Sequence, residues 1–442
     1  MTTTESTRAQ AAAPSAAELP RIRRRTTAVL VLTQVLGGLG VAIGIALSAL
    51  LAQETSGSEA LSGLAATSSV AGTAVLALPL ASLMSRRGRR AGLVLAYLIG
   101  AAGAALVVLA AVVGSFPLLL LGMAAFGAGS SANLQARFAA ADLAEPRHRG
   151  RAIATVVWAT TVGAVLGPNI AGPAGRSVTG LADGRIPAAA GPFVWAAGVF
   201  LVVAVVVAVA LRPDPLLTAR ALLGPQDSGR PESRSLRASV AAVRVSPMAR
   251  LALLTIAVSH TAMVAIMVMT PLDLVHHGAD IELIGLVFSS HILGMYAFSP
   301  VMGWLADRSP GGPPAPGAAP VGRISVIGLS VVLLSLAALL AGTARGDHVQ
   351  SAAALFLLGL GWSAGLVAGS ALLTDSVPQE ARAGVQGLAD LSMSSLAGAG
   401  GALAGVVVAQ AGYGWLNALG ACLLVPVAVL ALLTRGRMPR TS

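Results

Sequence analysis

Four ionisable side chains fall inside long apolar stretches of this sequence, where such groups are rare. They are Arg137, His260, His291 and Asp390. Burying an ionisable group in hydrocarbon is costly, so each of them is a functional hypothesis by default. Histidine titrates near physiological pH, which makes His260, near the middle of its stretch, our first candidate for a proton-coupling site. Asp390 and His291 are the other candidates, and for each of them a structural polar group satisfied by its neighbours is an equally good interpretation.

Arg137 and Asp390 have further alternatives. Arg137 lies about one helical turn from the end of its apolar stretch, so its long side chain could reach the membrane interface. Asp390 lies about two turns beyond Arg382, and it could carry a proton or belong to a lock between loops.

The apolar stretches dominate the composition. Of the 442 residues, 55% are hydrophobic and 11% are charged, and the mean hydropathy is +0.80. A soluble protein would carry roughly twice that share of charge, so we expect a membrane protein. The single cysteine, Cys422, excludes an internal disulfide.

The sequence has no pattern typical of an enzyme or an ATP-driven pump. It contains no lysine, so it cannot supply the lysine of a G-x-x-x-x-G-K-[ST] phosphate-binding loop. No nucleophile lies in a pattern with a base. The loop 273–282 gathers histidines and acidic residues, but their spacing matches no known metal site. We expect no catalytic residue, no cofactor and no metal site.

Twelve apolar segments have close to the roughly 20 residues that a helix needs to cross a bilayer. The sequence therefore predicts an all-α integral membrane protein. The predicted spans are Thr26–Ala52, Ala60–Met84, Ala91–Val113, Phe116–Ala141, Ala152–Ala174, Ala188–Leu211, Arg250–Leu272, Leu283–Leu305, Ile324–Ala344, Gln350–Thr374, Ala383–Ala411 and Trp415–Thr434.

The distribution of arginine predicts the orientation in the membrane. If the amino terminus is inside, 25 of the 29 arginines fall in cytoplasmic segments, and Arg176, Arg185 and Arg345 fall outside. Such asymmetry places both termini in the cytoplasm of a multi-pass plasma-membrane protein. It also explains the net charge of +11 without nucleic acid as a partner. The segment before Thr26 has no cleavable signal pattern, and arginine without lysine suggests GC-rich coding in a bacterial host.

The chain divides into two similar halves. The predicted parts are a cytoplasmic tail (1–25), a six-helix bundle (26–211), a cytoplasmic linker (212–249), a second six-helix bundle (250–434) and a cytoplasmic tail (435–442). Each half carries an aspartate after its fourth span and an arginine seven residues later, namely Asp142 with Arg149 and Asp375 with Arg382. This repetition predicts two pseudo-symmetric bundles.

The loops after the second and eighth spans carry a related motif. The first copy is 81-ASLMSRRGRR-90 and the second begins 303-GWLADR-308. With these loops, the twelve spans and the central linker, the whole chain resembles the major facilitator superfamily, whose loop motif is G-x-L-A-D-R-x-G-R-R. The residues that fit its cytoplasmic gate are Arg86, Gly88, Arg89, Asp142, Arg149, Gly303, Asp307, Arg308, Asp375 and Arg382. Ala81 and Ser85 depart from the motif.

The resemblance implies that these loop residues hold the cytoplasmic side closed by pairing across loops. We expect Arg86 or Arg89 to pair with Asp142, and Asp307 or Arg308 to pair with Arg382. The alternative is that the arginines only enforce membrane topology.

The segment 163-GAVLGPNIAG-172 places small residues at every fourth position around a proline, which predicts a kinked helix docked closely on a neighbour. It is similar to the antiporter motif G-x-x-x-G-P-x-x-G-G of drug:proton exporters in the superfamily. The residues concerned are Gly163, Gly167, Pro168, Asn169 and Gly172, and Ala171 replaces one glycine. Ordinary close packing of helices is the alternative.

The resemblance implies that the first, fourth, seventh and tenth spans line a central cavity, and polar, thioether and aromatic side chains recur at helical spacing in these spans and in the eighth. Such a lining suits a hydrophobic or cationic organic molecule. The candidates are Gln34, Asn133, Arg137, His260, Met263, Met267, His291, Met295 and Trp362. The alternative is that the methionines serve packing or face lipid.

These observations favour a secondary transporter that works by alternating access, exports a small molecule in exchange for protons or another coupling ion, and acts as a monomer in the lipid bilayer. An importer of a small nutrient on the same fold is the first alternative. A membrane receptor that does not transport is the second.

Overall fold

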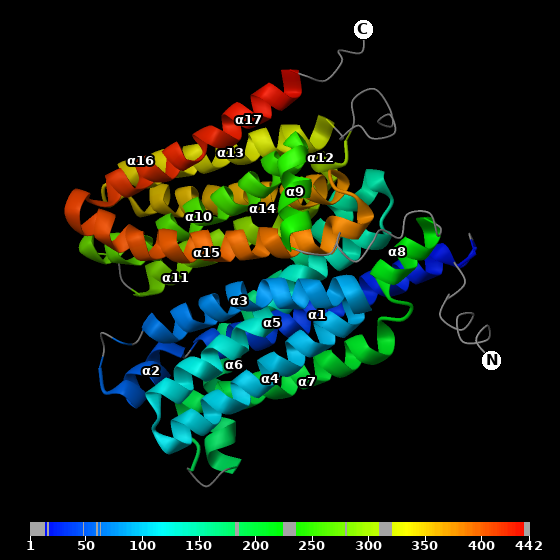
Figure 1. Cartoon of the computed structure of the whole chain (residues 1–442). Helices are drawn as coiled ribbons and strands as arrows, with labels where there is room; N and C mark the ends of the chain where they lie inside the picture. Colours follow the sequence, from blue (N-terminus) through cyan, green and yellow to red (C-terminus); the bar gives the residue numbers. More distant parts are fainter. Residues whose placement is uncertain are drawn as a thin grey trace, which may run out of the picture.

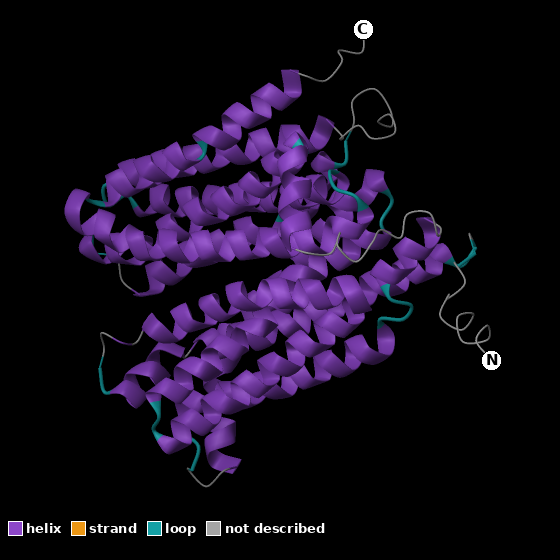
Figure 2. Ribbon diagram, viewed as in Figure 1, coloured by secondary structure: helices purple, strands orange, loops and turns teal. Residues whose placement is uncertain are grey.

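The computed structural model describes residues 14–15, 17–46, 48–58, 61, 63–181, 185–223, 236–278, 281–308 and 321–436. Its regular elements in these ranges are helices (Figure 2). The amino-terminal bundle comprises α1 (Leu19–Ala46), α2 (Ser48–Ser56), α3 (Gly63–Arg87), α4 (Arg89–Val113), α5 (Phe116–Leu143), α6 (Arg149–Leu181) and α7 (Gly191–Ala210). Short 3-10 turns at Pro146–His148 and Ala188–Ala190 precede α6 and α7.

The linker contains α8 (Pro215–Leu223) and α9 (Leu236–Val245). The carboxy-terminal bundle comprises α10 (Pro247–His276), α11 (Ile281–Ile292), a π-helical segment (Leu293–Ala297), α12 (Ser299–Ala306), α13 (Val321–Thr343), α14 (His348–Asp375), α15 (Gln379–Ala411), α16 (Tyr413–Leu423) and α17 (Val425–Gly436). Figure 1 shows the two bundles as separate layers, with α10 to α17 in one and α1 to α7 in the other.

The prediction of twelve spans is confirmed, because the described residues hold twelve helical segments that are long and apolar enough to cross a membrane. Their ends differ from the prediction by up to about two turns. The first helix begins at Leu19 instead of Thr26, since arginines favour a helix and let it continue beyond the apolar part. The eighth span is interrupted by the π-helical segment before α12, where Pro300 lies in the first turn.

Twelve consecutive spans in the described residues bring the end of the last span back to the side on which the first span begins. In Figure 1, α1 begins at the right of the molecule, and α16 and α17 run from the left edge toward that side. At this end α3, α5, α12 and α14 also finish, and Arg89, Arg149 and Arg323 lie there. We call it the arginine-rich end.

Glycine lets helices within the amino-terminal bundle approach closely. A Cβ atom added at Gly122 of α5 would lie 2.8 Å from the backbone nitrogen of Val107 in α4. Phe126 fills the space beside them, and its ring centroid is 5.3 Å from that of Phe200 in α7. Close backbone contact and aromatic packing thus hold this bundle together.

The linker helix α8 is docked on the α3–α4 junction. Gly88 makes this tight turn with φ +90, a left-handed conformation that favours glycine. Asp214 accepts hydrogen bonds from the backbone nitrogens of Arg90, at 2.7 Å, and Leu216, at 3.0 Å. One carboxylate therefore caps the first turns of both α4 and α8.

Candidate functional site

A fully buried ion pair lies where the two bundles meet. Arg137 of α5 and Asp390 of α15 are 1% and 0% exposed, and their Nη2 and Oδ1 atoms are 2.6 Å apart. Asp390 also accepts a hydrogen bond from Nε2 of Gln135, at 2.7 Å. Arg137 in addition donates to the hydroxyl of Ser370 in α14, at 3.2 Å. This α5–α15 ion pair joins the bundles. Because Arg137 is buried and paired there, the interpretation that its side chain reaches the membrane interface is wrong.

A second buried cluster lies closer to the arginine-rich end. Nε of Arg89 donates to Asp142 at 2.7 Å, and the side chain also donates to Gln135 at 3.0 Å and to Gln386 of α15. Gln386 in turn donates to Thr374 at 3.2 Å. The predicted pairing of Arg89 with Asp142 is confirmed, and it connects through Gln386 to the opposite bundle. Arg86 is exposed.

The carboxylate of Asp307, just after α12, caps the start of α6 in the other bundle. It accepts hydrogen bonds from the backbone nitrogens of Gly150 and Arg151, each at 2.8 Å. A negative charge is favourable there because the first amide groups of a helix have no partner within it. Burial raises the pKa of Asp307 above its usual value, although these N–H groups and the nearby arginines Arg323 and Arg151 act in the opposite direction.

Asp375 at the end of α14 completes this contact. It pairs with Arg149 from the amino-terminal bundle and with Arg323 from the start of α13. Arg323 also donates to the backbone carbonyl of Pro146 at 2.6 Å. Charges of both bundles therefore alternate along the α6–α12 side of the interface.

The predicted pairing of Asp307 or Arg308 with Arg382 is wrong. Arg382 donates to Gln379 within its own helix, and the guanidinium of Arg308 lies 3.4 Å from the ring centroid of Trp304. Asp307 instead faces Arg323, which begins α13 after the proline-rich insertion and occupies the place that Arg89 has in the first half.

The two copies of the loop motif are structurally unequal. Where the second copy has Asp307, the first has Ser85, whose hydroxyl donates to Ser82 in its own helix at 2.8 Å. The carbonyl of Ser85 accepts a hydrogen bond from Arg220 of α8 at 2.7 Å. Ser85 thus serves the linker helix, and the α3–α15 side lacks the carboxylate that the α6–α12 side has.

His260, Trp362 and Tyr296 form an aromatic cluster near mid-membrane in the carboxy-terminal bundle. Nε1 of Trp362 donates to Nδ1 of His260 at 2.8 Å, so this ring nitrogen carries no proton in the arrangement seen. The ring of Tyr296 meets that of Trp362 edge to face, with centroids 5.7 Å apart. The cluster lies about two turns along α14 from Ser370, the residue that contacts Arg137.

A polar cluster occupies the middle of the amino-terminal bundle. Gln34 donates to the carbonyl of Asn133 at 3.2 Å and to the hydroxyl of Thr160 at 3.0 Å, and its own Oε1 is buried without a partner. The hydroxyl of Tyr97 donates to the side chain of Asn133 at 2.8 Å. Gln34 and Asn133, both predicted from spacing, therefore lie together.

The other predicted cavity residues lie mainly within the carboxy-terminal bundle. Met263 and Met295 are buried in its apolar core, and Met267 packs against that core. His291 is 1% exposed between α11 and α14, where its Nδ1 donates to the carbonyl of Leu355 at 2.8 Å. Packing therefore accounts for the methionine stripe.

The small residues of α6 contact α1 directly. A Cβ atom added at Gly163 would meet the backbone of Gly38 and Leu39, and one at Gly167 would meet Ala42. The prediction of close docking at these two glycines is confirmed. The side chains of Pro168 and Asn169 and the environment of Gly172 lie outside the part of the chain that the structure describes.

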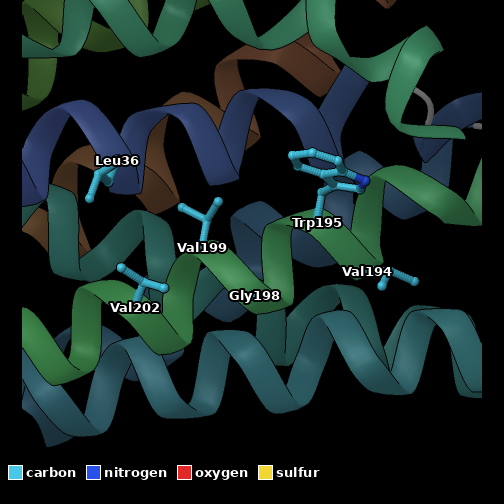
Figure 3. A pocket seen from close by; sticks show the side chains of 6 residues that line it. All are labelled: Leu36, Val194, Trp195, Gly198, Val199 and Val202. Atoms are coloured by element: carbon cyan, nitrogen blue, oxygen red, sulfur yellow. The ribbon is translucent and has the colours of Figure 1, made fainter. Parts of the chain in front are cut away.

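A separate pocket of about 440 Å³ lies on the outer surface between α1 and α7 (Figure 3). Its lining is apolar and includes Leu36, Trp195 and Val202. All its residues belong to one bundle, so this pocket is not part of the interface described above.

Sequence reasoning missed three residues of the interface, namely Gln135, Gln386 and Arg323, and it also missed Tyr97 in the polar cluster of the amino-terminal bundle. Both glutamines are fully buried, and each lies on an apolar helix at a position that faces the opposite bundle. The signal available in the sequence was the spacing Gln135–Asp142, since residues seven apart share one helix face.

Comparison with known proteins agrees with this architecture. The model of the Major Facilitator Superfamily matches residues 30–272 and again 251–442. The chain is 36% identical over 422 residues to the uncharacterized MFS-type transporter YdeG of Bacillus subtilis, covering 94% of this chain and 93% of that protein. It is 29% identical to the riboflavin transporter RfnT of Brucella anthropi, covering 92% and 94% of the two chains.

Among solved structures, the transporter FucP in its outward conformation superposes with a TM-score of 0.66 at 15% identity, covering 92% of this chain and 98% of that one. The chain therefore belongs to the Major Facilitator Superfamily. It is a multi-pass membrane protein with the fold of secondary transporters, which are typically not enzymes.

Proposed function

We propose that this protein is a proton-coupled exporter of small hydrophobic or cationic organic compounds. The observation that carries the direction of transport is the docking of α6 on α1 at Gly163 and Gly167, which form the part of the antiporter-like segment that the structure describes. The excess of arginine supports a cytoplasmic position of the arginine-rich end. The protein then acts as a monomer in the plasma membrane of a bacterium, with both termini inside.

In this orientation, the hydrogen bonds and ion pairs between the bundles close the cytoplasmic side. Across the interface, Asp307 pairs with Arg151, Asp375 with Arg149 and Asp390 with Arg137. The described arrangement is thus one in which cargo leaves or enters from outside. Rocking of the two bundles about the central site would expose this site first to one side of the membrane and then to the other.

Asp390 is the coupling group that this geometry supports best. A proton that arrives from the outer side neutralises the carboxylate, and Arg137 then loses the charge that binds α5 to α15. The cytoplasmic side opens, the proton leaves, and the re-formed pair closes that side after cargo has bound. Proton entry is thereby tied to export. About 2.3 kcal/mol per 100 mV is available for each charge that crosses the membrane.

His260 serves substrate binding in this scheme. Its Nδ1 is occupied by Trp362, and the rings of Trp362 and Tyr296 offer apolar faces that can also bind a cation. Gln34 and Asn133 would contribute polar contacts from the opposite bundle.

Purified protein in liposomes tests the proposal. An imposed pH gradient should drive movement of a fluorescent lipophilic cation, and Asp390→Asn should remove the gradient dependence while leaving downhill exchange. Proton-coupled export would be contradicted if the flux through the unmodified protein did not depend on the pH gradient for any cation of a broad panel.

Import of a metabolite is the second candidate, and the similarity to the riboflavin transporter RfnT favours it. Export and import predict opposite changes in the amount of compound that cells retain. Cells that lack the protein should retain more of an exported compound and less of an imported one, and radiolabelled riboflavin is the first compound to measure.

A further inference from the structure

A polar pocket of about 240 Å³ lies at the arginine-rich end of the amino-terminal bundle, beside the α6–α12 side of the bundle interface. It is formed by the start of α1, the α5–α6 junction and the first turns of α6. Arg23, His148 and Arg151 bring basic side chains to it, and Glu145 is its acidic residue. Nε of Arg23 is buried and has no hydrogen-bond partner among the described residues, so this guanidinium keeps one donor that is not used.

The charges around this pocket do not balance. Glu145 pairs with Arg23 at 2.8 Å and with Arg147 at 2.9 Å. The hydrogen bond from Arg147, followed by the one from Arg23, holds the pKa of Glu145 below its usual value. Glu145 is therefore ionised at neutral pH. Two negative charges, those of Glu145 and of Asp307 in the opposite bundle, face Arg23, Arg147 and Arg151, so the site keeps one positive charge that is not balanced.

The pocket continues into a surface of α6 that faces lipid. Arg151 and Thr155 line the pocket, and Trp158 and Val162 follow on the same helix face with exposed fractions of 44% and 38%. The faces of α6 on either side are occupied, because Ala154 packs against α12 and Gly163 packs against α1. A ligand in the pocket could therefore extend along an apolar strip inside the membrane.

We propose that this pocket binds the phosphate of an anionic phospholipid whose acyl chains lie along Trp158 and Val162. Arginine suits phosphate because its N–H groups form a planar fork. A free anion would use only the polar part, whereas a phospholipid uses both the basic pocket and the apolar strip that adjoins it.

The site would be coupled to the closure of the bundles through Arg151. Nε of this arginine lies 3.8 Å from Asp307, whose carboxylate also caps α6. When Asp307 moves away from α6, Arg151 loses its partner. A lipid phosphate beside it then supplies the replacement charge.

The test measures binding of dioleoylphosphatidylglycerol to the purified full-length protein in detergent. Unmodified protein should bind this lipid at least tenfold more tightly than dioleoylphosphatidylcholine. Arg23→Gln should weaken binding about five- to tenfold. The matched control is Arg24→Gln, which removes the same charge from the next position of α1 but is exposed and does not line the pocket. It should change binding less than twofold.

Equal weakening by both substitutions would show general attraction to the basic helix and would overturn the proposal. Millimolar inorganic phosphate that displaces the lipid completely would assign the site to a free anion and would also overturn it. A second measurement needs no substitution. Phosphatidylglycerol with a photoreactive acyl chain should label the peptide around Trp158, and labelling confined to other helices would refute the site.

Discussion

Asp390→Asn should loosen the arginine-rich end of the molecule. The substitution keeps the size of the side chain but removes the charge that faces Arg137 at 2.6 Å. Breaking a buried ion pair by removing one partner typically costs about 3 to 5 kcal/mol, because the other charge remains buried. Arg137 keeps its contacts to the carbonyl of Leu134 and to Ser370, so we take the low end, about 3 kcal/mol.

This free energy belongs to the arrangement in which the bundles meet, since the two residues lie in different bundles. A loss of about 3 kcal/mol shifts the ratio of closed to open molecules by roughly 150-fold. A population of open molecules too small to detect in the unmodified protein should become a substantial fraction in the variant.

Distances between spin labels can measure this change. Labels at Arg87→Cys and Glu380→Cys, in a Cys422→Ser background, report on opposite bundles at this end. The unmodified protein should give one short distance, and Asp390→Asn should add a longer one. The control is Asp347→Asn, because Asp347 caps α14 within its own bundle.

The double variant Arg137→Met with Asp390→Asn sharpens the test. Removing both charges leaves no buried charge without a partner, so the distances should return toward those of the unmodified protein. Unchanged distances in Asp390→Asn, or a double variant that opens further than the single one, would refute the reasoning.

Three further substitutions test other contacts. Gly163→Ala should lower the melting temperature, because a Cβ there meets the backbone of α1, whereas Gly180→Ala on the same helix has open space and should not. Trp362→Phe keeps an aromatic ring but removes the donor to His260, a bond worth about 0.5 to 1.5 kcal/mol, so substrate affinity in a binding titration should fall about two- to tenfold. The pKa of Asp307 is raised when it packs against α6, so the closed arrangement binds its proton more tightly than an open one with a solvated carboxylate. In the Asp390→Asn variant, where protonation of Asp390 plays no part, acidification from neutral pH through the raised pKa should therefore favour the short distance, and adding Asp307→Asn should remove that pH dependence.

The helices could be predicted from the sequence because each crossing needs a long apolar segment, and that requirement is local. The pairing of Arg89 with Asp142 was also predictable, since the family motif connects adjacent loops of one bundle. The partner of Arg137 was not. Helical spacing indicates which residues share a face but not which face of another bundle lies opposite, and Asp390 is more than 250 positions away.

The wrong partner for Asp307 has a different cause. The insertion after α12 displaces the start of α13 along the sequence, so Arg323 was not recognised as the counterpart of Arg89. The stripe of methionines was ambiguous for a third reason. Periodicity alone does not distinguish a face that lines a cavity from one that packs in a core, and here Met263 and Met295 pack.

Because Ser85 replaces the motif aspartate, the contacts on the two sides of the bundle interface are asymmetric. The carboxylate of Asp307 binds the start of α6, while on the other side the hydroxyl of Ser85 in α3 donates within its own helix. When the two bundles separate, the α3–α15 side, which has Ser85, opens at a smaller free-energy cost than the α6–α12 side. The arginine-rich end would consequently open first beside α15. A molecule that enters from this end would then reach the centre from the α3–α15 side.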